Sequence, residues 1–282
     1  MTSRPKISYF IQDGRPLTHR KTHDLAQSME GNLTRKFNQL DGSKFFYKPV
    51  SNIREADLVI FTGGADISPQ LYNEAAIPGT QFNVHRDIND VWAYNWCRDK
   101  VKLGICRGAQ LLNTLSGGSL WQDVPNHRSG SHMVEVRNPD TEKFWDSKPL
   151  NGWSKSLTFS VTSTHHQQMR LGPEAVLLGH AVPNVNADRG SICEWKQGGS
   201  PYISPNAVGL RRNLKIPHQE PWINEWENDD MLDPEFVWYP NTQSFCVQGH
   251  PEYSNAEPAF IAYVGLVLER IFEKKGLAQC AA

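Results

Sequence analysis

The sequence lacks the features that would tie it to a membrane or to nucleic acid. No stretch approaches the about 20 consecutive apolar residues of a membrane-spanning helix, and the apolar run near residue 10 is too short for a secretory signal. Lysine and arginine total 29 against 30 aspartates and glutamates, the formal net charge is -1, and no long run of one sign occurs. We therefore expect neither a membrane nor a nucleic-acid partner.

Cysteine is scarce, and its spacing does not indicate a disulfide framework. The chain has five cysteines and no Cys-x-x-Cys pair, and an odd number cannot all pair within one chain. This pattern favours a reducing compartment, so we expect a cytoplasmic protein. Cys193 and Cys246 lie in apolar strand patterns, and we expect both in the core.

What is present is enough apolar sequence for a substantial core. The chain has 282 residues, of which 39% are hydrophobic. Through the first 125 residues, short apolar runs alternate with helical patterns, as in the βαβ units of a parallel sheet. The predicted strands cover 7–12, 45–50, 58–62 and 101–105, and the predicted helices cover 24–40, 88–98 and the residues after 106 as far as 115.

The second half of the chain is less regular. From about 127 to 193, short strands such as 156–162 and 175–179 predict a mostly β extension. Residues 198–240 are rich in proline, asparagine and tryptophan without periodicity, which predicts a long excursion loop; its tryptophans either stack on a substrate or cap a core. A strand over 244–248 and a helix over 258–275 follow, and we expect one domain over residues 1–282.

A cysteine stands at a predicted strand-to-helix junction, in Lys-Leu-Gly-Ile-Cys-Arg-Gly-Ala-Gln over residues 102–110. Gly104 and Gly108 lie two residues before and after Cys106, where larger side chains would collide in a nucleophile elbow. The helix N-terminus favours the thiolate, and the amide of Arg107 points where an oxyanion would form. The alternative is a small buried cysteine at a strand end. We predict that Cys106 is the nucleophile.

His250 is the predicted base among ten histidines. A thiolate that attacks an amide needs a proton donor for the leaving amine, normally a histidine held by a third group. The segment Gln-Gly-His-Pro-Glu at 248–252 ends an apolar strand, and parallel strands place catalytic groups at their carboxyl ends. Glu252 is close enough to bond the second ring nitrogen and fix the tautomer. Taken alone, the triplet is more typical of a surface turn, and it indicates a catalytic role only beside the Cys106 elbow.

The paired glycines Gly63 and Gly64 follow the predicted strand 58–62. They let the backbone approach a ligand closely, and the amide of Gly64 is a candidate second oxyanion donor. On its own the pair is also typical of a simple turn. A phosphate site is disfavoured because neither Gly-x-Gly-x-x-Gly nor a Gly-Lys loop follows.

The order of these motifs resembles the class I glutamine amidotransferase superfamily, in particular its γ-glutamyl hydrolase branch of the peptidase C26 type. The motifs are Gly-Gly, Gly-Ile-Cys-Arg-Gly-Ala-Gln, Ser-Thr-His-His-Gln at 163–167 and Gln-Gly-His-Pro-Glu. Further blocks at 62–72, 86–87 and 111–123 resemble the bacterial γ-glutamyl-γ-aminobutyrate hydrolases. We accordingly expect an α/β fold, a flavodoxin-like three-layer sandwich with a central, mostly parallel sheet and a small β extension.

The resemblance also implies roles for individual residues. Cys106 would form a γ-glutamyl thioester, His250 and Glu252 would complete the triad, and the amides of Gly64 and Arg107 would form the oxyanion hole. The γ-glutamyl group would be held by Gly63, Gln110, Ser163, Thr164, His165 and His166. From the residues alone, His165 and His166 are as compatible with ordering their loop as with contacting substrate.

Two departures from the family pattern bear on specificity. Gly249 stands where a tryptophan usually precedes the catalytic histidine, which predicts a wider pocket beside the base. The 198–240 excursion is longer than in the simple hydrolases. Neither a metal nor an organic cofactor is expected, because the spacing of His85, His127 and His132 matches no zinc pattern and favours scattered surface histidines.

The sequence therefore predicts a cysteine-dependent hydrolase of a small-molecule γ-glutamyl substrate, either glutamine or a γ-glutamyl amine. The same residues are compatible with a glutaminase component that delivers ammonia to a separate synthetase subunit. A catalytically silent binding protein that uses the tryptophan-rich excursion as an interface is the alternative from another class, and an intact Cys, His and Glu set argues against it.

Overall fold

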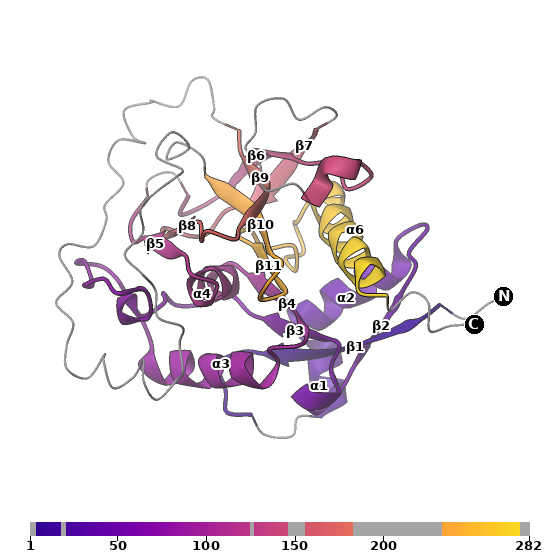
Figure 1. The fold of residues 1–282 in the computed structure, drawn as a ribbon, viewed down its shortest axis with the longest axis horizontal. Helices are drawn as coiled ribbons and strands as arrows, with labels where there is room; N and C mark the ends of the chain where they lie inside the picture. The colour runs from indigo at the N-terminus through magenta and orange to yellow at the C-terminus, as the bar shows by residue number, and fades with distance from the viewer. Residues whose placement is uncertain (1–3, 18–20, 125–126, 146–155, 183–232, 277–282) are drawn as a thin grey trace.

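A computed structural model of the protein describes residues 4–17, 21–124, 127–145, 156–182 and 233–276. Within these residues, the main feature is a nine-stranded sheet with helices on both faces (Figure 1). In spatial order its strands are β2 (Phe46–Pro49), β1 (Lys6–Gln12), β3 (Leu58–Phe61), β4 (Val101–Ile105), β11 (Ser244–Val247), β10 (Pro234–Tyr239), β9 (Val176–Ala181), β6 (Ser131–Val136) and β7 (Leu157–Thr162).

The first five strands in that order are parallel, and they run 2-1-3-4-5 in their own sequence order, which is the flavodoxin-like arrangement. β3, β4 and β11 are buried along their whole length, as expected for strands covered on both faces. Because β4 and β11 are neighbours, their carboxyl ends lie at one sheet edge. The predicted strands of this half of the sheet are confirmed.

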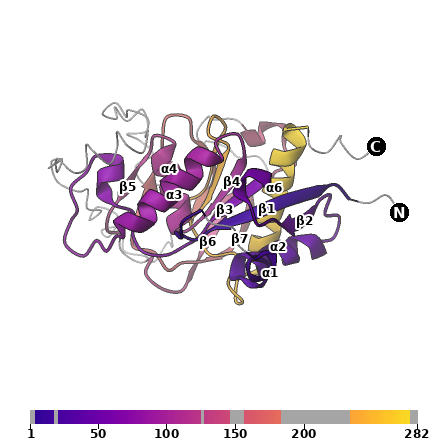
Figure 2. The same ribbon diagram turned by 90° about the horizontal axis from the view of Figure 1, so that it is seen from below.

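The helices form the two outer layers. α3 and α4 lie on one face of the sheet, and α1, α2 and α6 lie on the other (Figure 2). The predicted three-layer α/β sandwich is therefore confirmed. The helices are α1 (Thr22–Gln27), α2 (Met29–Gln39), α3 (Val84–Trp96), α4 (Arg107–Leu115) and α6 (Pro258–Lys274), with short 3-10 turns at Ile53–Glu55, Pro69–Tyr72 and Glu142–Trp145.

The predicted β extension is present and is larger than expected. β10, β9, β6 and β7 continue the main sheet beyond β11 with antiparallel pairings. A separate two-stranded sheet joins β5 (Ser119–Trp121) to β8 (Gln168–Arg170). The antiparallel register places the first residues of β6 and β10 and the last residue of β7 on the same side of the sheet as the carboxyl end of β11.

The predicted 198–240 excursion is wrong at its end. Pro234–Tyr239 is strand β10, buried along its whole length and paired with both β11 and β9. Its aromatic and branched residues fit a strand buried on both faces, and the proline occupies the first position, where a missing amide donor is tolerated. The remainder of the predicted excursion and Cys193 lie outside the described residues, whereas Cys246 is buried in β11 as expected.

The single helix predicted over 24–40 is two helices. Ser28 separates α1 from α2 with an extended backbone (φ -65°, ψ 167°), and its side chain accepts a hydrogen bond from the Gly31 amide. A serine that caps a new helix competes with continuation of the old one. The apolar periodicity continues across Ser28, so the sequence pattern predicted one continuous helix.

None of the described helices is both long and apolar enough to cross a membrane.

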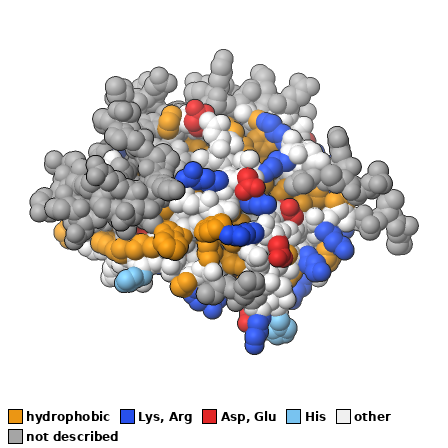
Figure 3. All heavy atoms as spheres, turned by 60° about the horizontal axis from the view of Figure 1, so that its bottom comes forward, with side chains coloured by type: hydrophobic (Ala, Val, Ile, Leu, Met, Phe, Trp, Pro, Cys, Tyr) orange, Lys and Arg blue, Asp and Glu red, His pale blue; other side chains and the backbone are white. Residues whose placement is uncertain are grey.

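On the outer face of α3, Trp92 and Trp96 are 56% and 50% exposed, and the guanidinium of Arg54 lies 4.1 Å from the centre of the Trp96 ring. Figure 3, in which the bottom of Figure 1 comes forward, shows hydrophobic side chains on this side of the molecule with Lys and Arg nearby.

Candidate active site

Cys106 connects β4 directly to α4 and has a strained backbone. Its φ of 50° and ψ of -109° lie outside the regions that non-glycine residues usually adopt, and it occupies the N-cap position of α4. Its amide donates to the carbonyl of Val247 in the adjacent strand β11, at 2.8 Å. The strand pairing and the helix together hold this conformation, which is the geometry of a nucleophile elbow.

The elbow requires glycine at the two predicted positions. A Cβ on Gly104 would lie 2.5 Å from the carbonyl carbon and oxygen of Gly108, and a Cβ on Gly108 would lie 2.1 Å from the carbonyl oxygen of Phe61. Both distances are far below any real contact, and the obstacles are backbone atoms that belong to α4 and β3. The crowding predicted from the sequence is confirmed.

His250 follows β11 and is buried with its ring fixed on several sides. Its amide donates to Thr162 Oγ1 at 2.9 Å, and that hydroxyl donates to the His250 carbonyl at 3.2 Å. The ring stacks on Tyr253 with 4.2 Å between centroids. Nδ1 hydrogen-bonds Glu252 Oε1 at 2.7 Å, so the second ring nitrogen remains for another partner.

Cys106 and His250 meet beside Gly63. A Cβ on Gly63 would lie 2.8 Å from His250 Cε1 and 3.7 Å from the Cβ of Cys106, so both side chains border the same small volume. Burial by itself would lower the pKa of His250, but hydrogen bonds to Cys106 and Glu252, together with their charges, raise that pKa to about 10. The protonated imidazole is therefore favoured at neutral pH.

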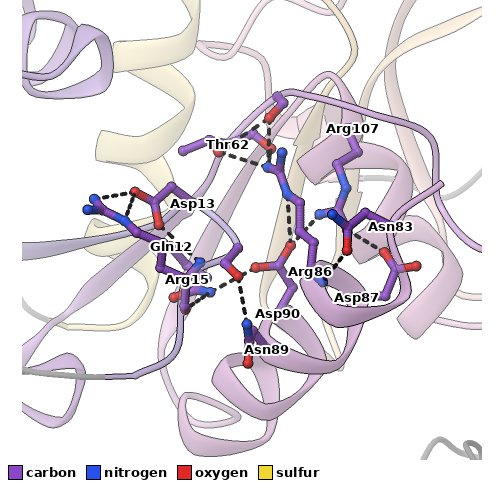
Figure 4. A network of polar contacts seen from close by, with 12 residues as sticks. Gln12, Asp13, Arg15, Thr62, Asn83, Arg86, Asp87, Asn89, Asp90 and Arg107 are labelled. Carbon is purple, nitrogen blue, oxygen red and sulfur yellow. Dashed lines mark hydrogen bonds and ion pairs between the residues drawn. The ribbon is translucent and has the colours of Figure 1, made fainter. Parts of the chain in front are cut away.

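The side chain of Arg107 lies in a buried ion network (Figure 4). Its guanidinium donates to Asp87 and Asp90, both on α3. Asp90 also accepts from Gln12 Nε2 at 2.8 Å. A bidentate arrangement of this kind fixes the guanidinium plane, so α3 holds the first residue of α4 and with it the amide next to Cys106.

Arg86, on the same helix, fixes the loop after β3. Its Nη2 donates to the Thr62 carbonyl at 3.1 Å, to Thr62 Oγ1 at 3.0 Å and to the Gly63 carbonyl at 2.7 Å. A Cβ on Gly64 would lie 2.0 Å from Arg86 Nη1, so only glycine fits beside this guanidinium. α3 thus anchors both backbone segments whose amides are predicted to form the oxyanion hole (Figure 4).

The predicted substrate-binding residues do not all face the thiol. Gln110 is buried, and its Nε2 donates to the Gln167 carbonyl at 3.0 Å and to Gln248 Oε1 at 3.5 Å. Ser163 is also buried, and its hydroxyl donates to the His127 carbonyl at 2.8 Å. Gln110 and Ser163 therefore brace the backbone around the site.

The next three residues of that segment diverge. Thr164 is exposed. His165 is buried, and burial lowers its pKa to about 3 although Glu235 raises it. His166 turns the other way: its Nε2 bonds Asp66 Oδ1 at 3.0 Å, and this hydrogen bond raises its pKa.

Two expectations about this region are wrong. The space beside Gly249 is filled, because a Cβ there would lie 2.9 Å from the Thr162 carbonyl oxygen and 3.2 Å from the Phe260 ring, so no wider pocket opens on that side. His127 and His132 are not scattered surface residues: their ring centroids are 5.1 Å apart, and His127 is buried. His85, on α3, is exposed.

Several residues that support the site were missed by sequence reasoning. Tyr253 immediately follows Glu252 and could have been suspected from that position. Thr162 ends a strand of the antiparallel extension, and its contact with His250 follows from sheet pairing that spacing does not reveal. Arg86 belongs to the block 86–87 that resembles the γ-glutamyl-γ-aminobutyrate hydrolases, but the sequence does not show that it contacts the 62–64 loop.

Comparison with known proteins finds similarities to part of this chain. Residues 48–182 match the family model of Peptidase C26. The protein NtpR of Enterococcus hirae is 33% identical over 135 residues, which cover 42% of this chain and 53% of that protein. The glutamine amidotransferase-like protein YvdE of Lactococcus lactis is 30% identical over 135 residues, covering 44% of this chain and 56% of that protein.

The chain thus spans about half the length of these curated relatives. Among solved structures, a glutamine amidotransferase from Thermotoga maritima matches over 98% of this chain and 99% of that one, with 14% identity and a TM-score of 0.43.

Proposed function

We propose that this chain hydrolyses a γ-glutamyl amide bond, because its residues 48–182 match the Peptidase C26 model and it is similar to a glutamine amidotransferase-like protein. The substrate would be glutamine or a γ-glutamyl amine such as γ-glutamyl-γ-aminobutyrate. The observation that carries this proposal is the convergence of Cys106, His250 and Glu252 at the carboxyl edge of β4 and β11.

In the proposed acylation step, the Cys106 thiolate attacks the γ-carbonyl carbon of the substrate. The tetrahedral intermediate collapses as the C–N bond breaks, and the His250 imidazolium gives its proton to the departing amine or ammonia. The γ-glutamyl group is left as a thioester on Cys106. Glu252 keeps Nδ1 of His250 engaged, so the second nitrogen carries the transferred proton.

Deacylation reverses the proton transfer. His250, now neutral, takes a proton from a water molecule that attacks the thioester carbonyl, and the C–S bond breaks to release glutamate. In both steps the negative oxygen would face the amides of Gly64 and Arg107. Arg107 is the first residue of α4, whose leading amides have no partner inside the helix, and this supports its assignment as a donor.

The names of the relatives favour a second candidate on the same chemistry, in which the released ammonia passes to a separate synthetase. Steady-state kinetics on glutamine and on a panel of γ-glutamyl amines separates the two. A free-standing hydrolase turns over one of the amines without a partner. A component of an amidotransferase prefers glutamine and accelerates only when its synthetase is added.

The proposal is tested with Cys106→Ala, which removes the nucleophile without opening a large cavity. Turnover should fall at least about 10³-fold with an unchanged far-UV circular dichroism spectrum. Cys97→Ala is the matched control, because Cys97 is another buried cysteine outside the site. A glutamine-mimicking diazoketone should modify wild-type protein at Cys106, as seen by mass spectrometry; activity that survives in Cys106→Ala would refute the assignment.

A further inference from the structure

Three histidines and two carboxylates gather at the end of the antiparallel extension. His132 is on β6, Glu235 is on β10, and His165 lies in the segment between β7 and β8. His132 Nε2 is 3.0 Å from Glu235 Oε1, and His165 Nε2 is 3.9 Å from the same oxygen. The His127 ring lies between the other two, with centroids 5.1 Å from His132 and 4.9 Å from His165. Asp233 adds Oδ2 at 3.5 Å from His127 Nε2.

Two of these groups are buried with hydrogen-bonding capacity left over. His165 Nε2 and Glu235 Oε2 have no hydrogen-bond partner among the described residues, and the two side chains are 2% and 0% exposed. Buried polar atoms are normally paired, so two orphaned atoms on neighbouring side chains indicate a missing ligand.

The tautomer of His165 supports the same conclusion. Its Nδ1 lies 3.0 Å from the Gln167 carbonyl oxygen, which can only accept a hydrogen bond. Nδ1 therefore carries the proton, and Nε2 presents a lone pair toward Glu235 and the other two rings. A backbone carbonyl that orients the far nitrogen of a histidine is the usual outer partner of a metal-binding imidazole.

We propose that this cluster binds one divalent transition-metal ion of the zinc type, with His127, His132, His165 and Glu235 as ligands. Three imidazoles and a carboxylate suit zinc and its neighbours, whereas calcium and magnesium prefer oxygen ligands. Ligand atoms about 2.1 Å from a tetrahedral ion are about 3.4 Å apart. The potential ligand atoms of His127, His132 and Glu235 lie within 4.8 Å of one another, and His165 Nε2 lies 3.9 Å from Glu235 Oε1, so small side-chain movements would bring all four ligands to one ion.

The site is structural in character. Its proposed ligands come from β6, β10 and two connecting segments, so one ion ties together parts of the chain more than 100 residues apart. The Glu235 carbonyl accepts a hydrogen bond from the Gln248 amide at 2.9 Å, which places the cluster one strand away from His250. None of the proposed metal ligands belongs to the proposed triad, so the metal site does not depend on the proposed function.

The test uses full-length, tag-free protein stripped with a chelator, reloaded with Zn²⁺ or Co²⁺ and passed through a desalting column. Wild-type protein should retain about one ion per chain by mass spectrometry of the metal, and Co²⁺ should give the visible absorption of a tetrahedral site. Zn²⁺ should also raise the thermal midpoint. His132→Ala and Glu235→Gln should lose the bound ion and the thermal shift.

The control is His85→Ala, which removes an exposed histidine from α3 and should retain the ion. Cys106→Ala should retain it as well, which separates this inference from the catalytic proposal. If Glu235→Gln does not fold, His132→Gln serves in its place, because the His132 side chain is 21% exposed. Wild-type protein that retains no ion, or His132→Ala that retains as much as His85→Ala, would overturn the inference.

Discussion

At the scale of single residues, Glu252 is, after Cys106, the second partner that raises the pKa of His250. It makes one 2.7 Å hydrogen bond to Nδ1, and its second oxygen has no hydrogen-bond partner within the described part of the chain. Glu252→Gln keeps an acceptor but removes the charge that helps to raise the His250 pKa to about 10. We predict that kcat/KM falls about 10²-fold, less than for Cys106→Ala, and that the alkaline limb of its pH profile moves to lower pH.

The alkaline limb moves to lower pH because removal of the Glu252 charge lowers the pKa of His250. A negative neighbour favours the imidazolium, so its removal lets His250 lose its proton at lower pH. Glu174→Gln, which neutralises an exposed carboxylate, is the control and should leave the profile unchanged. A rate and profile equal to wild type in Glu252→Gln would remove Glu252 from the triad.

Gly108 is the residue at which the elbow tolerates least change. A methyl group there meets the Phe61 carbonyl oxygen at 2.1 Å, so Gly108→Ala must push β3 and α4 apart. We predict a loss of about 3 kcal/mol or more in unfolding free energy, measured by urea denaturation. Gly79→Ala is the matched control, because Gly79 has φ +99° and nothing within 4 Å of a new Cβ, so only about 1 kcal/mol of backbone strain is expected. Equal losses in the two variants would show that the contact is not decisive.

The residues predictable from sequence were those whose partners are local. The elbow was readable because Gly104, Cys106 and Gly108 lie within five positions and their mutual crowding follows from chain geometry. The histidine cluster was not readable, because His132 and Glu235 are 103 positions apart and meet only through the order of strands in the sheet.

At the scale of elements, α3 acts as a common anchor for the two backbone segments beside Cys106. Arg86→Lys keeps the charge but loses the planar donor group that bonds Thr62 and Gly63. We predict that kcat falls about 10- to 100-fold through misplacement of the 62–64 loop, with a smaller change in KM.

Arg98→Lys is the control for this variant. Arg98 follows α3 and is exposed, and its guanidinium donates to the Asn95 side chain, away from the 62–64 loop, so its replacement should leave kcat unchanged. A purely structural role for Arg86 would lower the amount of folded enzyme and leave kcat per folded molecule as in wild type. That outcome, established by active-site titration with the diazoketone, would contradict the positioning role.

Elements were predictable where apolar runs have clear ends. β3 and β11 are short apolar runs that stop at a polar residue, β4 stops at Cys106, and each strand was predicted within one residue of its ends. β10 was missed because its tryptophan and proline continue the composition of the preceding stretch. The sequences of antiparallel neighbours such as β6 and β9 do not show that the two strands pair. The strand order of the antiparallel extension therefore could not be predicted.

At the scale of the whole molecule, one sheet joins the parallel and antiparallel halves. β11 pairs in parallel with β4 and antiparallel with β10, so neither half has an independent edge at the junction. We propose that the chain folds as one domain and predict a single thermal transition, with near- and far-UV circular dichroism curves that coincide. Gly108→Ala should shift the entire transition to lower temperature. Two separate steps, with only one of them moved by this variant, would argue for two domains.

The pairing of β9 with β10 has a consequence for how this chain could change over time. His180 faces Pro234 across the two strands, so the end of β9 and the start of β10 lie side by side. A connection between neighbouring strands can be of almost any length: lengthening it tenfold adds only about 2 kcal/mol of closure entropy. A tight hairpin in place of the whole connection between β9 and β10 is therefore compatible with the same pairing of the two strands. Related proteins with a much shorter connection here can share the same fold.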